Sequence, residues 1–405
     1  MRILYVSDVY FPRVNGVSTS IQTFRRELAR RGHDSTLVAP EYPAAYPVEA
    51  GVLRVPSRYL PLDPEDRALR PRALRRAESD LARERFDLVH VQTPFLAHYS
   101  GLRLARRLGV PCIATYHTLF EEYLYHYVPA VPRAALRALA RRVSRAQCNA
   151  LDAVVVPSSA MRDTLARYGV TAPTEIVPTG IPLADFACGD GTRFRADRGI
   201  DPARPLLLYV GRVAFEKNIA FLLRVLARVR ASRPDALLVI CGEGPAVRSL
   251  QRAAHALGVA SSVLFAGYLD RASALLDCYR AADVFVFASR TETQGLVLLE
   301  AMALGVPVVS TAVMGTRDIV GPGRGALVAR DDEADFAAQV TRLLGDRALR
   351  ERLGREAREY ARDWSAAAMA ERMEAFYRRV VERARAGGCR PLAPTPVSRA
   401  AGAGR

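Results

Sequence analysis

The sequence has 405 residues, which exceeds the size of one ordinary hydrophobic core and predicts two domains. Half of the residues are apolar and a quarter are charged, as in soluble globular proteins, and no apolar run reaches the roughly 18 residues of a membrane-spanning helix. The net charge of +16 favours polyanionic partners, such as a membrane surface, a nucleic acid or a phosphorylated small molecule.

The N-terminus and the cysteines indicate where the protein resides. The first residues lack the apolar core and the small-residue cleavage site of a signal peptide. The six cysteines are scattered without the paired spacing of a disulfide framework or a metal cluster. We therefore expect a cytoplasmic protein with reduced thiols and without a bound metal.

Short apolar runs alternate with amphipathic helical patterns along the chain. The first series predicts strands at Ile3–Val6, Ser35–Ala39, Leu88–Val91, Cys112–Tyr116 and Ala153–Pro157, with a helix at Ser20–Arg31. The second series predicts strands at Leu206–Val210, Ala236–Cys241, Val263–Ala266, Val284–Ala288 and Val306–Ser310, with helices at Ile219–Ala231 and Pro245–Leu257. This rhythm is typical of parallel sheets that are covered by helices on both faces.

The two series predict an α/β protein with two doubly wound, Rossmann-like domains, 1–182 and 190–365. The Pro- and Gly-rich stretch from Pro178 to about Gly191 is the natural hinge between them. A helical pattern over 366–386 follows, and the Gly-, Pro- and Ala-rich tail 387–405 is expected to be disordered. Two such domains that face each other would leave a central cleft at the carboxyl ends of their strands, which is the default ligand site.

The first candidate motif follows the first strand. It is the run Asn15-Gly16-Val17-Ser18-Thr19-Ser20, which opens a helix. Gly16 allows the backbone to approach a ligand, and a helix N-terminus favours an anion. The alternative is that Ser18 or Ser20 is a plain helix N-cap.

The second candidate is His117, at the carboxyl end of the predicted strand Cys112–Tyr116. A lone histidine is more often structural than catalytic, but this position lies at the edge where the cleft is expected. Tyr123, His126 and Tyr127 follow it, and amphipathic aromatic side chains suit a membrane interface or an acceptor pocket.

A basic helical segment comes next. It contains five arginines and no acidic residue, and Leu136, Leu139 and Val143 fall at helical spacing beside them; the arginines are Arg133, Arg137, Arg141, Arg142 and Arg145. A basic amphipathic helix of this kind can lie on an anionic bilayer. A helix packed on the core with a solvated arginine face is an equal alternative.

The second half carries the only lysine of the chain. The sequence has 58 basic residues, and all of them except Lys217 are arginines. A compact ammonium approaches a phosphate as a point charge where a planar guanidinium is too large. Lys217 and Arg212 lie in the loop after the strand Leu206–Val210, which is where α/β folds hold phosphates. Together they can converge on a diphosphate and stabilise the charge of a departing nucleotide.

The most specific motif follows the strand Val284–Ala288. Glu292 lies in the loop and Glu300 on the following helix, separated by seven residues. Carboxylates accept hydrogen bonds from vicinal hydroxyls such as those of a ribose or a hexose. The amides near Gly295 and Leu296 can hold a phosphate at the helix N-terminus. The run Cys241-Gly242-Glu243-Gly244-Pro245 either lines the same pocket through its backbone or is only a sharp turn.

These residues together resemble glycosyltransferase family 4, whose members are retaining enzymes of the GT-B fold. The resemblance spans most of the chain and depends on the Gly-Arg…Glu-Lys-Asn run and on Glu292 and Glu300 with seven residues between them. It implies a nucleotide-sugar donor bound mainly to the C-terminal domain, and a last helix that crosses back to pack on the N-domain.

The resemblance also implies roles for single residues. Arg212 and Lys217 match the pair that binds the diphosphate, and Glu300 matches the carboxylate that holds the ribose. Glu292 matches the carboxylate that contacts the donor sugar. Gly16 matches the loop that approaches the donor phosphates, and His117 matches the active-site histidine near the transferred sugar.

Family resemblance suggests front-face transfer with retention of the anomeric configuration. The departing phosphate takes the acceptor proton while Arg212 and Lys217 stabilise it, and the catalytic set is these two residues with His117 and Glu292. The sequence has no Asp-X-Asp motif, so we expect no metal and no cofactor other than the donor substrate.

The acceptor is inferred from a narrower resemblance. The stretches from Thr115 to Pro129 and from Thr291 to Leu296 look like those of diacylglycerol glucosyltransferases. This similarity implies UDP-glucose as donor, a lipid acceptor and peripheral attachment to the inner face of the cell membrane. Cell-wall, polysaccharide or phosphatidylinositol acceptors are the alternatives within the family.

Three other classes compete with this interpretation. A nucleotide-sugar epimerase on the same architecture would need no acceptor, but the spacing of Glu292 and Glu300 belongs to the transferases. A nucleic-acid-binding protein would suit the charge, but the sequence has no interleaved basic and aromatic platform, so no nucleic-acid partner is expected. A donor sensor without catalysis is disfavoured by the intact Lys217, Glu292, Glu300 and His117.

Overall fold

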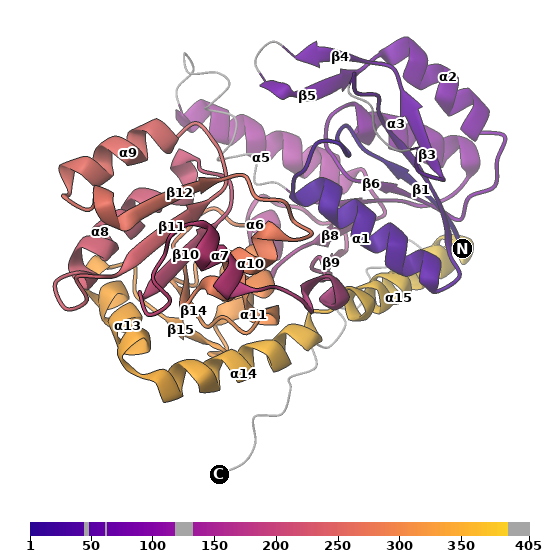
Figure 1. The fold of residues 1–405 in the computed structure, drawn as a ribbon. Coiled ribbons are helices and arrows are strands. Elements are labelled where there is room, and N and C mark those ends of the chain that lie inside the picture. Colours follow the sequence, from indigo (N-terminus) through magenta and orange to yellow (C-terminus); the bar gives the residue numbers. More distant parts are fainter. Residues whose placement is uncertain (44–47, 61–62, 118–132, 388–405) are drawn as a thin grey trace. The chain divides into compact units, whose positions relative to one another are not determined.

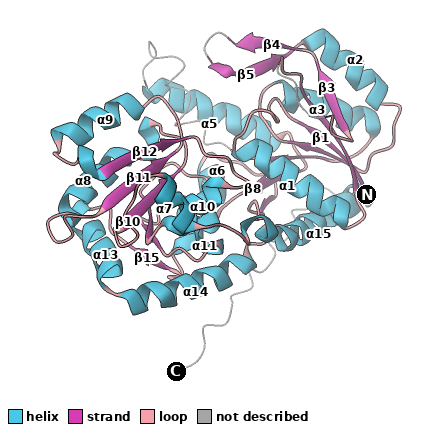
Figure 2. Cartoon of the chain, in the orientation of Figure 1, coloured by secondary structure: helices cyan, strands magenta, loops and turns pink. Residues whose placement is uncertain are grey.

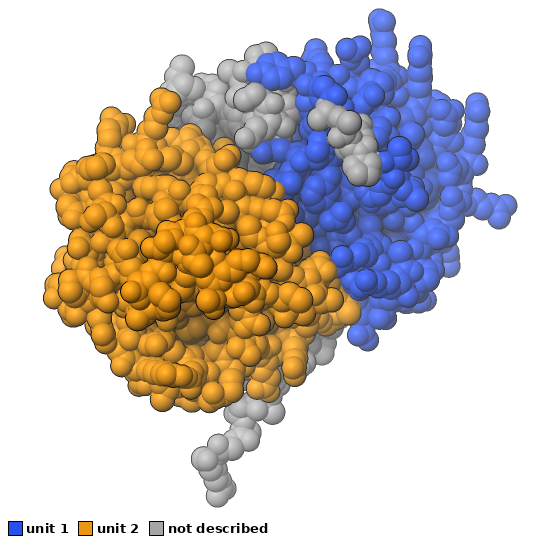
Figure 3. Space-filling view, viewed as in Figure 1, with its two compact units in different colours: residues 1–157, 161–177, 370–405 blue, residues 158–160, 178–369 orange. Residues whose placement is uncertain are grey.

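The structure is a computed structural model, and it describes residues 1–43, 48–60, 63–117 and 133–387. These residues form two compact units, which Figure 3 colours separately. Unit 1 contains residues 1–157, 161–177 and the segment from Ala370 onward, and unit 2 contains residues 158–160 and 178–369. Besides the short excursion at 158–160, the chain passes from unit 1 to unit 2 at Val177–Pro178 and back at Met369–Ala370.

Unit 1 is built on a seven-stranded sheet in the order β3-β2-β1-β6-β7-β8-β9, and every pairing in it is parallel (Figure 1). Its strands are β1 (Arg2–Val6), β2 (Asp34–Pro40), β3 (Val52–Val55), β6 (Leu88–Val91), β7 (Cys112–Thr115), β8 (Ala153–Val156) and β9 (Thr174–Ile176). A separate antiparallel pair consists of β4 (Ser57–Leu60) and β5 (Asp63–Leu69). The connecting helices are α1 (Gly16–Arg30), α2 (Pro71–Leu81), α3 (Leu96–Leu108), α5 (Arg133–Asn149) and α6 (Ser159–Arg167).

Unit 2 repeats the architecture with a six-stranded parallel sheet in the order β12-β11-β10-β13-β14-β15. Its strands are β10 (Leu206–Val210), β11 (Leu237–Cys241), β12 (Val263–Gly267), β13 (Val284–Phe287), β14 (Val308–Ser310) and β15 (Ala326–Val328). Its helices are α7 (Gly191–Asp197), α8 (Ile219–Val229), α9 (Val247–Ala256), α10 (Ala274–Ala281), α11 (Leu296–Ala303), α12 (Thr316–Val320), α13 (Glu333–Gly345) and α14 (Arg347–Asp363). All of them except α12 are labelled in Figure 2.

The central strands of both sheets read as continuous apolar runs because helices cover both of their faces. All four residues of β13 are at most 1% exposed, and β10 and β11 are buried along their whole length. The predicted class of two doubly wound domains is therefore confirmed. Every predicted strand is present within one or two residues, and β3, β4, β5, β9 and β15 are additional.

The last helix, α15 (Ala366–Arg385), packs on unit 1 as a crossover helix. The hydroxyl of Tyr377 lies 3.0 Å from that of Tyr5 and 2.6 Å from Nδ1 of His90, and Nε2 of His90 lies 2.8 Å from the hydroxyl of Thr115. Burial lowers the pKa of His90 well below its usual value, so the ring is neutral in this network. Apart from Gly387, the tail that was predicted to be disordered lies outside the described residues.

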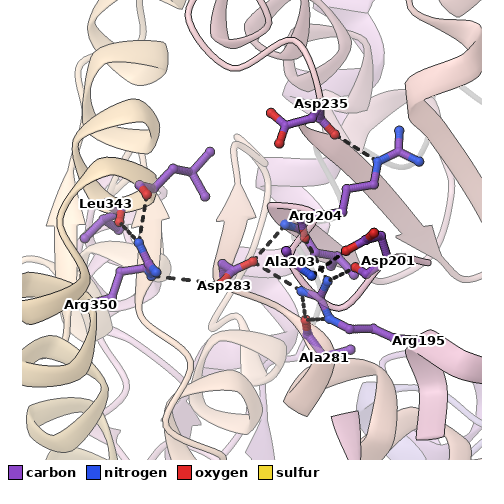
Figure 4. A network of polar contacts seen from close by, with 11 residues as sticks. Arg195, Asp201, Ala203, Arg204, Asp235, Ala281, Asp283, Leu343 and Arg350 are labelled. Atoms are coloured by element: carbon purple, nitrogen blue, oxygen red, sulfur yellow. Dashed lines mark hydrogen bonds and ion pairs between the residues drawn. The ribbon is translucent and has the colours of Figure 1, made fainter. Parts of the chain in front are cut away.

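The amino ends of the unit 2 strands are fixed by a polar network, which Figure 4 shows from close by. Arg195 donates to the carbonyls of Ala281, Asp201 and Arg204. Asp283 accepts from Arg195 and from the amide of Leu206, at the first residue of β10. This network satisfies the carbonyl of Ala281, the last residue of α10, and leaves the opposite, carboxyl edge of the sheet for a ligand site.

Candidate functional site

Lys217 and Glu292 meet at the carboxyl edge of the unit 2 sheet. Lys217 ends the short 3-10 helix η2 (Phe215–Lys217) after β10, and Glu292 lies in the loop after β13. Because β10 and β13 are neighbours, their following loops lie side by side. The lysine Nζ is 2.6 Å from Oε1 of Glu292, and each side chain keeps 20% of its surface exposed. A charge pair that is both shielded and reachable is suited to a charged or hydroxylated ligand.

The loop that carries Arg212 depends on two glycines of the neighbouring turn. The amide of Val213 donates to the carbonyl of Glu243 at 2.8 Å, so the two loops pack backbone to backbone. A Cβ at Gly242 would lie 2.0 Å from the carbonyl oxygen of Gly211, and one at Gly244 would lie 2.4 Å from that of Val213. The run Cys241–Pro245 is therefore a turn whose glycines permit this close packing.

Arg212 itself is exposed at the tip of that loop. The hydroxyl of the buried Tyr209 donates to its carbonyl at 3.2 Å, which holds the backbone from below. Burial, followed by the charges of Glu292 and Glu216, raises the pKa of Tyr209 well above 10, so the hydroxyl stays protonated as a donor. The structure thus places both predicted cations, Arg212 and Lys217, on one rigid loop.

The Glu292 loop is held through its backbone. The carbonyl of Glu292 accepts from the amide of Gly315 at 2.9 Å. Gly295 has φ of 99°, a left-handed conformation that favours glycine, and it precedes α11 as its N-cap. Glycine has no side chain to cap the helix, so the amides of Leu296 and the next residue point toward whatever occupies the loop.

Glu300 lies on α11 and is 3% exposed. One carboxylate oxygen accepts from the hydroxyl of Tyr279 at 2.8 Å, and the other forms an ion pair with the guanidinium of Arg271. The Glu300 charge raises the pKa of Arg271 further and, after burial, also that of Tyr279. The structure thus places Glu300 on the helix that follows the Glu292 loop, and its ion-pair partner Arg271 has a side chain that is 41% exposed.

In unit 1 the carboxyl ends of β6 and β7 bring His117 next to Gln92. Nε2 of His117 lies 3.0 Å from Oε1 of Gln92. Burial lowers the pKa of His117 to about 4, so the imidazole is neutral near pH 7. Gln92 is 3% exposed, and its amide nitrogen has no hydrogen-bond partner in the part of the chain that the structure describes. Gln92 was not predicted; its position directly after β6 was the available signal.

Gly16 begins α1, four residues earlier than the predicted helix start. The expectation that Ser18 or Ser20 caps this helix is wrong, because the side chain of Asn15 accepts from the amide of Ser18 at 2.8 Å. A Cβ built on Gly16 would meet no atom of the described residues within 4 Å. Packing therefore does not require glycine at this position, and the space beside it is open.

Comparisons with known proteins agree on one family. The model for glycosyltransferase family 4 matches residues 14–185, and the model for group 1 glycosyl transferases matches residues 190–360. The alpha-monoglucosyldiacylglycerol synthase of Streptococcus pneumoniae is 34% identical over 317 residues, which cover 76% of this chain and 71% of that protein. The chain belongs to glycosyltransferase family 4. It is thus a retaining glycosyltransferase.

One further sequence relative and one solved structure are also similar to this chain. A GDP-mannose-dependent alpha-mannosyltransferase of Mycolicibacterium smegmatis is 33% identical, covering 86% of this chain and 90% of that protein. The solved sucrose-phosphate synthase of Thermosynechococcus elongatus superposes with a TM-score of 0.77 at 23% identity, covering 94% and 100% of the two chains. This last similarity shows the GT-B fold alone.

The basic helix of this glycosyltransferase is α5. Its first residue is Arg133, and the side chains of Arg137, Arg141, Arg142 and Arg145 are exposed. Leu136 is buried at 6%, whereas Leu139 and Val143 are 53% and 41% exposed. The helix therefore has a buried face and, beside the arginines, an exposed apolar strip. Tyr123, His126 and Tyr127 lie outside the described residues.

Two exposed aromatic side chains lie at the start of α3, and one of them, Tyr99, lies beside Gln147 of α5. Gln147 of α5 donates to the carbonyl of Pro94 at 2.7 Å, which joins the two helices. Phe95 and Tyr99 are 61% and 52% exposed. We call Phe95, Tyr99, Leu139 and Val143 the α5 apolar surface.

Among the described residues, no helix is long and apolar enough to cross a membrane, and no group of His, Cys, Asp and Glu is arranged to hold a metal ion.

Proposed function

We propose that this glycosyltransferase moves glucose from UDP-glucose to a diacylglycerol-type lipid at an anionic membrane surface. The observation that carries the proposal is the 34% identity to alpha-monoglucosyldiacylglycerol synthase, together with a helix that exposes arginines beside apolar side chains. In this proposal the domain 190–365 binds the donor and the domain 1–182 binds the acceptor. The enzyme acts from the cytoplasmic face as a peripheral protein.

The donor roles follow from the chemistry at the unit 2 sheet edge. Arg212 and Lys217 would bind the diphosphate, assisted by the amides at Gly295 and Leu296. Glu300 would accept from the ribose hydroxyls in place of Arg271. Glu292 would accept from the donor sugar, and the open space at Gly16 would admit the phosphates.

The transfer step needs no enzyme nucleophile in this scheme. The bond between the sugar C1 and the β-phosphate oxygen breaks, and the acceptor hydroxyl forms its bond to C1 on the same face. The leaving phosphate oxygen takes the proton of that hydroxyl. Lys217 and Arg212 stabilise the negative charge that develops on the phosphate. The neutral His117 would lie near the sugar as a hydrogen-bonding group rather than a cation.

The α5 surface supports the membrane part of the proposal. Each basic residue near an anionic bilayer contributes about 1 kcal/mol to binding, and apolar side chains contribute by burial in the interface. The charge of Arg141 is also engaged within the protein, since its guanidinium lies 5.6 Å from the ring centre of Tyr168. Arg137, Arg142 and Arg145 are likewise exposed on α5 and are the arginines changed in the vesicle-binding experiment.

Vesicle binding tests this part. Changing Arg137, Arg142 and Arg145 to Gln should weaken binding to vesicles of anionic lipid by roughly 100-fold, because about 3 kcal/mol is lost. The matched control changes the exposed Arg72, Arg75 and Arg76 of α2 to Gln, which removes equal charge elsewhere in unit 1. Equal loss in both variants would show that net charge, not the α5 surface, binds the membrane.

A GDP-mannose donor is the second candidate, because a relative at 33% identity depends on it. Calorimetric titration of UDP and GDP separates the two. We expect UDP to bind at least about tenfold more tightly than GDP. Tighter binding of GDP would favour mannosyl transfer while leaving the family and the roles of Arg212 and Lys217 unchanged.

A further inference from the structure

Gln294 makes a two-way contact with the backbone of a distant segment. Its side-chain oxygen accepts from the amide of Thr179 at 2.8 Å, and its side-chain nitrogen donates to the carbonyl of Thr179 at 2.7 Å. Both residues are buried, at 5% and 6% exposure. Gln294 lies two residues after Glu292 in the loop after β13, so this contact fixes the loop that carries the proposed sugar-binding carboxylate.

The segment on the other side of this contact is itself paired. The amide of Ile181 donates to the carbonyl of Trp364 at 2.9 Å, and the amide of Ala366 donates to that of Ile181 at 2.8 Å. A Cβ at Gly180 would lie 2.5 Å from the carbonyl oxygen of Ser365, so the two backbones touch. The result is a short parallel bridge between Ile181 and Ser365.

These paired segments lie near the two ends of the long part of unit 2, Pro178–Met369. The first crossing lies between Val177 and Pro178, next to Thr179, and the second lies between Met369 and Ala370, four residues after Ser365 of the bridge. The side chain of Gln294 therefore joins the Glu292 loop to the paired segments 179–181 and 364–366. Two further contacts of that loop, Lys217 to Glu292 and Gly315 to Glu292, lie at the carboxyl edge of the sheet.

We propose that Gln294 is a positioning residue for donor transfer, which sets the place of Glu292 by binding the loop to the crossing segment at Thr179. The inference rests on the proposed role of Glu292. A neutral amide side chain both donates and accepts, as the two contacts with Thr179 require. A misplacement of about 1 Å at a reacting group can reduce the rate roughly 100-fold, so a single lost tether can matter without a change of fold.

The test compares two substitutions. Gln294→Met keeps the size and loses both hydrogen bonds, and Gln251→Met on the exposed face of α9 is the matched control. Gln294→Met should raise the hydrogen-exchange rates of the Thr179 and Gly315 amides at least about tenfold, whereas Gln251→Met should leave these rates unchanged. An unchanged exchange rate of the Thr179 amide would show that Gln294 does not hold the Glu292 loop to this segment.

The kinetic readout separates positioning from general stability. For transfer from UDP-glucose to diacylglycerol vesicles, Gln294→Met should lower kcat by roughly 10- to 100-fold. Binding of UDP should change by less than about twofold, because Gln294 is not among the groups proposed to hold the nucleotide. Unchanged kcat, or a loss of UDP binding as large as the loss of kcat, would overturn the positioning role.

Gln294→Glu adds a rescue that a structural defect would not give. The carboxylate repels the Thr179 carbonyl, but the protonated acid can make both hydrogen bonds again. The activity of Gln294→Glu relative to the parent should therefore rise as the pH falls from 8 to 6, and a flat ratio would contradict the inference. If the parent enzyme transfers nothing from UDP-glucose, the proposed function fails, and the exchange of Thr179 and Gly315 alone decides the inference.

Discussion

Replacement of Lys217 by Ala is the sharpest test of the donor site. Its ammonium is 2.6 Å from Glu292 and the pair is four-fifths shielded from solvent, with each side chain 20% exposed. In the free enzyme such a pair contributes only about 1 kcal/mol to stability. In the transfer step the same ammonium would face the charge that develops on the leaving phosphate.

The expected effect on activity is larger than the effect on stability. Loss of one preorganised donor to a developing oxyanion costs about 3 kcal/mol, which is roughly a 150-fold decrease in kcat/KM. Lys217→Arg should also lose activity, by at least about tenfold, if the site needs a compact ammonium. Thermal unfolding of both variants should stay close to that of the parent.

The assay is steady-state transfer from UDP-glucose, with thermal unfolding measured on the same preparations. Lys217→Ala is compared with Arg290→Ala, whose guanidinium is paired with Asp331 on an exposed surface after the same strand as Glu292. The control should retain full activity. A Lys217→Ala enzyme with normal kcat/KM, or one whose loss is matched by unfolding, would refute the assigned role.

Three further outcomes are expected. Glu300→Gln should weaken UDP binding about tenfold by calorimetry, since a charged acceptor for the ribose is lost; unchanged binding would remove Glu300 from the ribose site. Gly16→Ala should leave thermal stability unchanged, because the added methyl meets no atom of the described residues within 4 Å, yet lower kcat/KM at least about tenfold; full activity would place the phosphates elsewhere. Burial lowers the pKa of His117 to about 4, below its value of about 6.5 in the unfolded chain. The contribution of the neutral ring to the free energy of unfolding is therefore present above about pH 6.5 and lost as the pH falls toward 4. His117→Gln should make the free energy of unfolding, measured in urea, depend less on pH between about 6.5 and 4.

The sheets were predictable because their strands are buried on both faces. β10, β11 and β13 are continuous apolar runs with helical patterns between them, and this signal needs no knowledge of the partner strands. β9 and β15 have only three residues each and lie at sheet edges, where half-exposed residues give no clear pattern. Their assignment depends on pairing with a neighbour that lies far away in the sequence.

The site was predictable where its residues follow strands. Lys217 and Glu292 follow β10 and β13, and because these strands are neighbours in the sheet, the two side chains form an ion pair. Arg271 and Tyr279, which contact the two oxygens of Glu300, gave no signal. Arg271 lies in the loop after β12 and Tyr279 on α10, and only the tertiary packing brings both of them to α11. Gln294 stood within the motif, but its partner Thr179 is 115 positions away and is a backbone group, which sequence patterns do not reveal.

The helix α5 shows a mixed outcome. The arginine spacing predicted an amphipathic basic helix, and the helix is present at Arg133–Asn149. The helical spacing of Leu136, Leu139 and Val143 predicted one apolar face. In the structure Leu136 is buried, whereas Leu139 and Val143 are exposed. A helical pattern gives the spacing of side chains but not the direction in which the rest of the unit lies.

The measurement that tests the central claim most directly is the transfer of radiolabelled glucose from UDP-glucose to vesicles that contain diacylglycerol and anionic lipid. UDP-galactose and GDP-mannose are run in parallel, with and without vesicles. The account predicts label in the organic phase from UDP-glucose, only with vesicles, and its loss in Lys217→Ala. Label that stays in a water-soluble product, or that comes only from GDP-mannose, would contradict it.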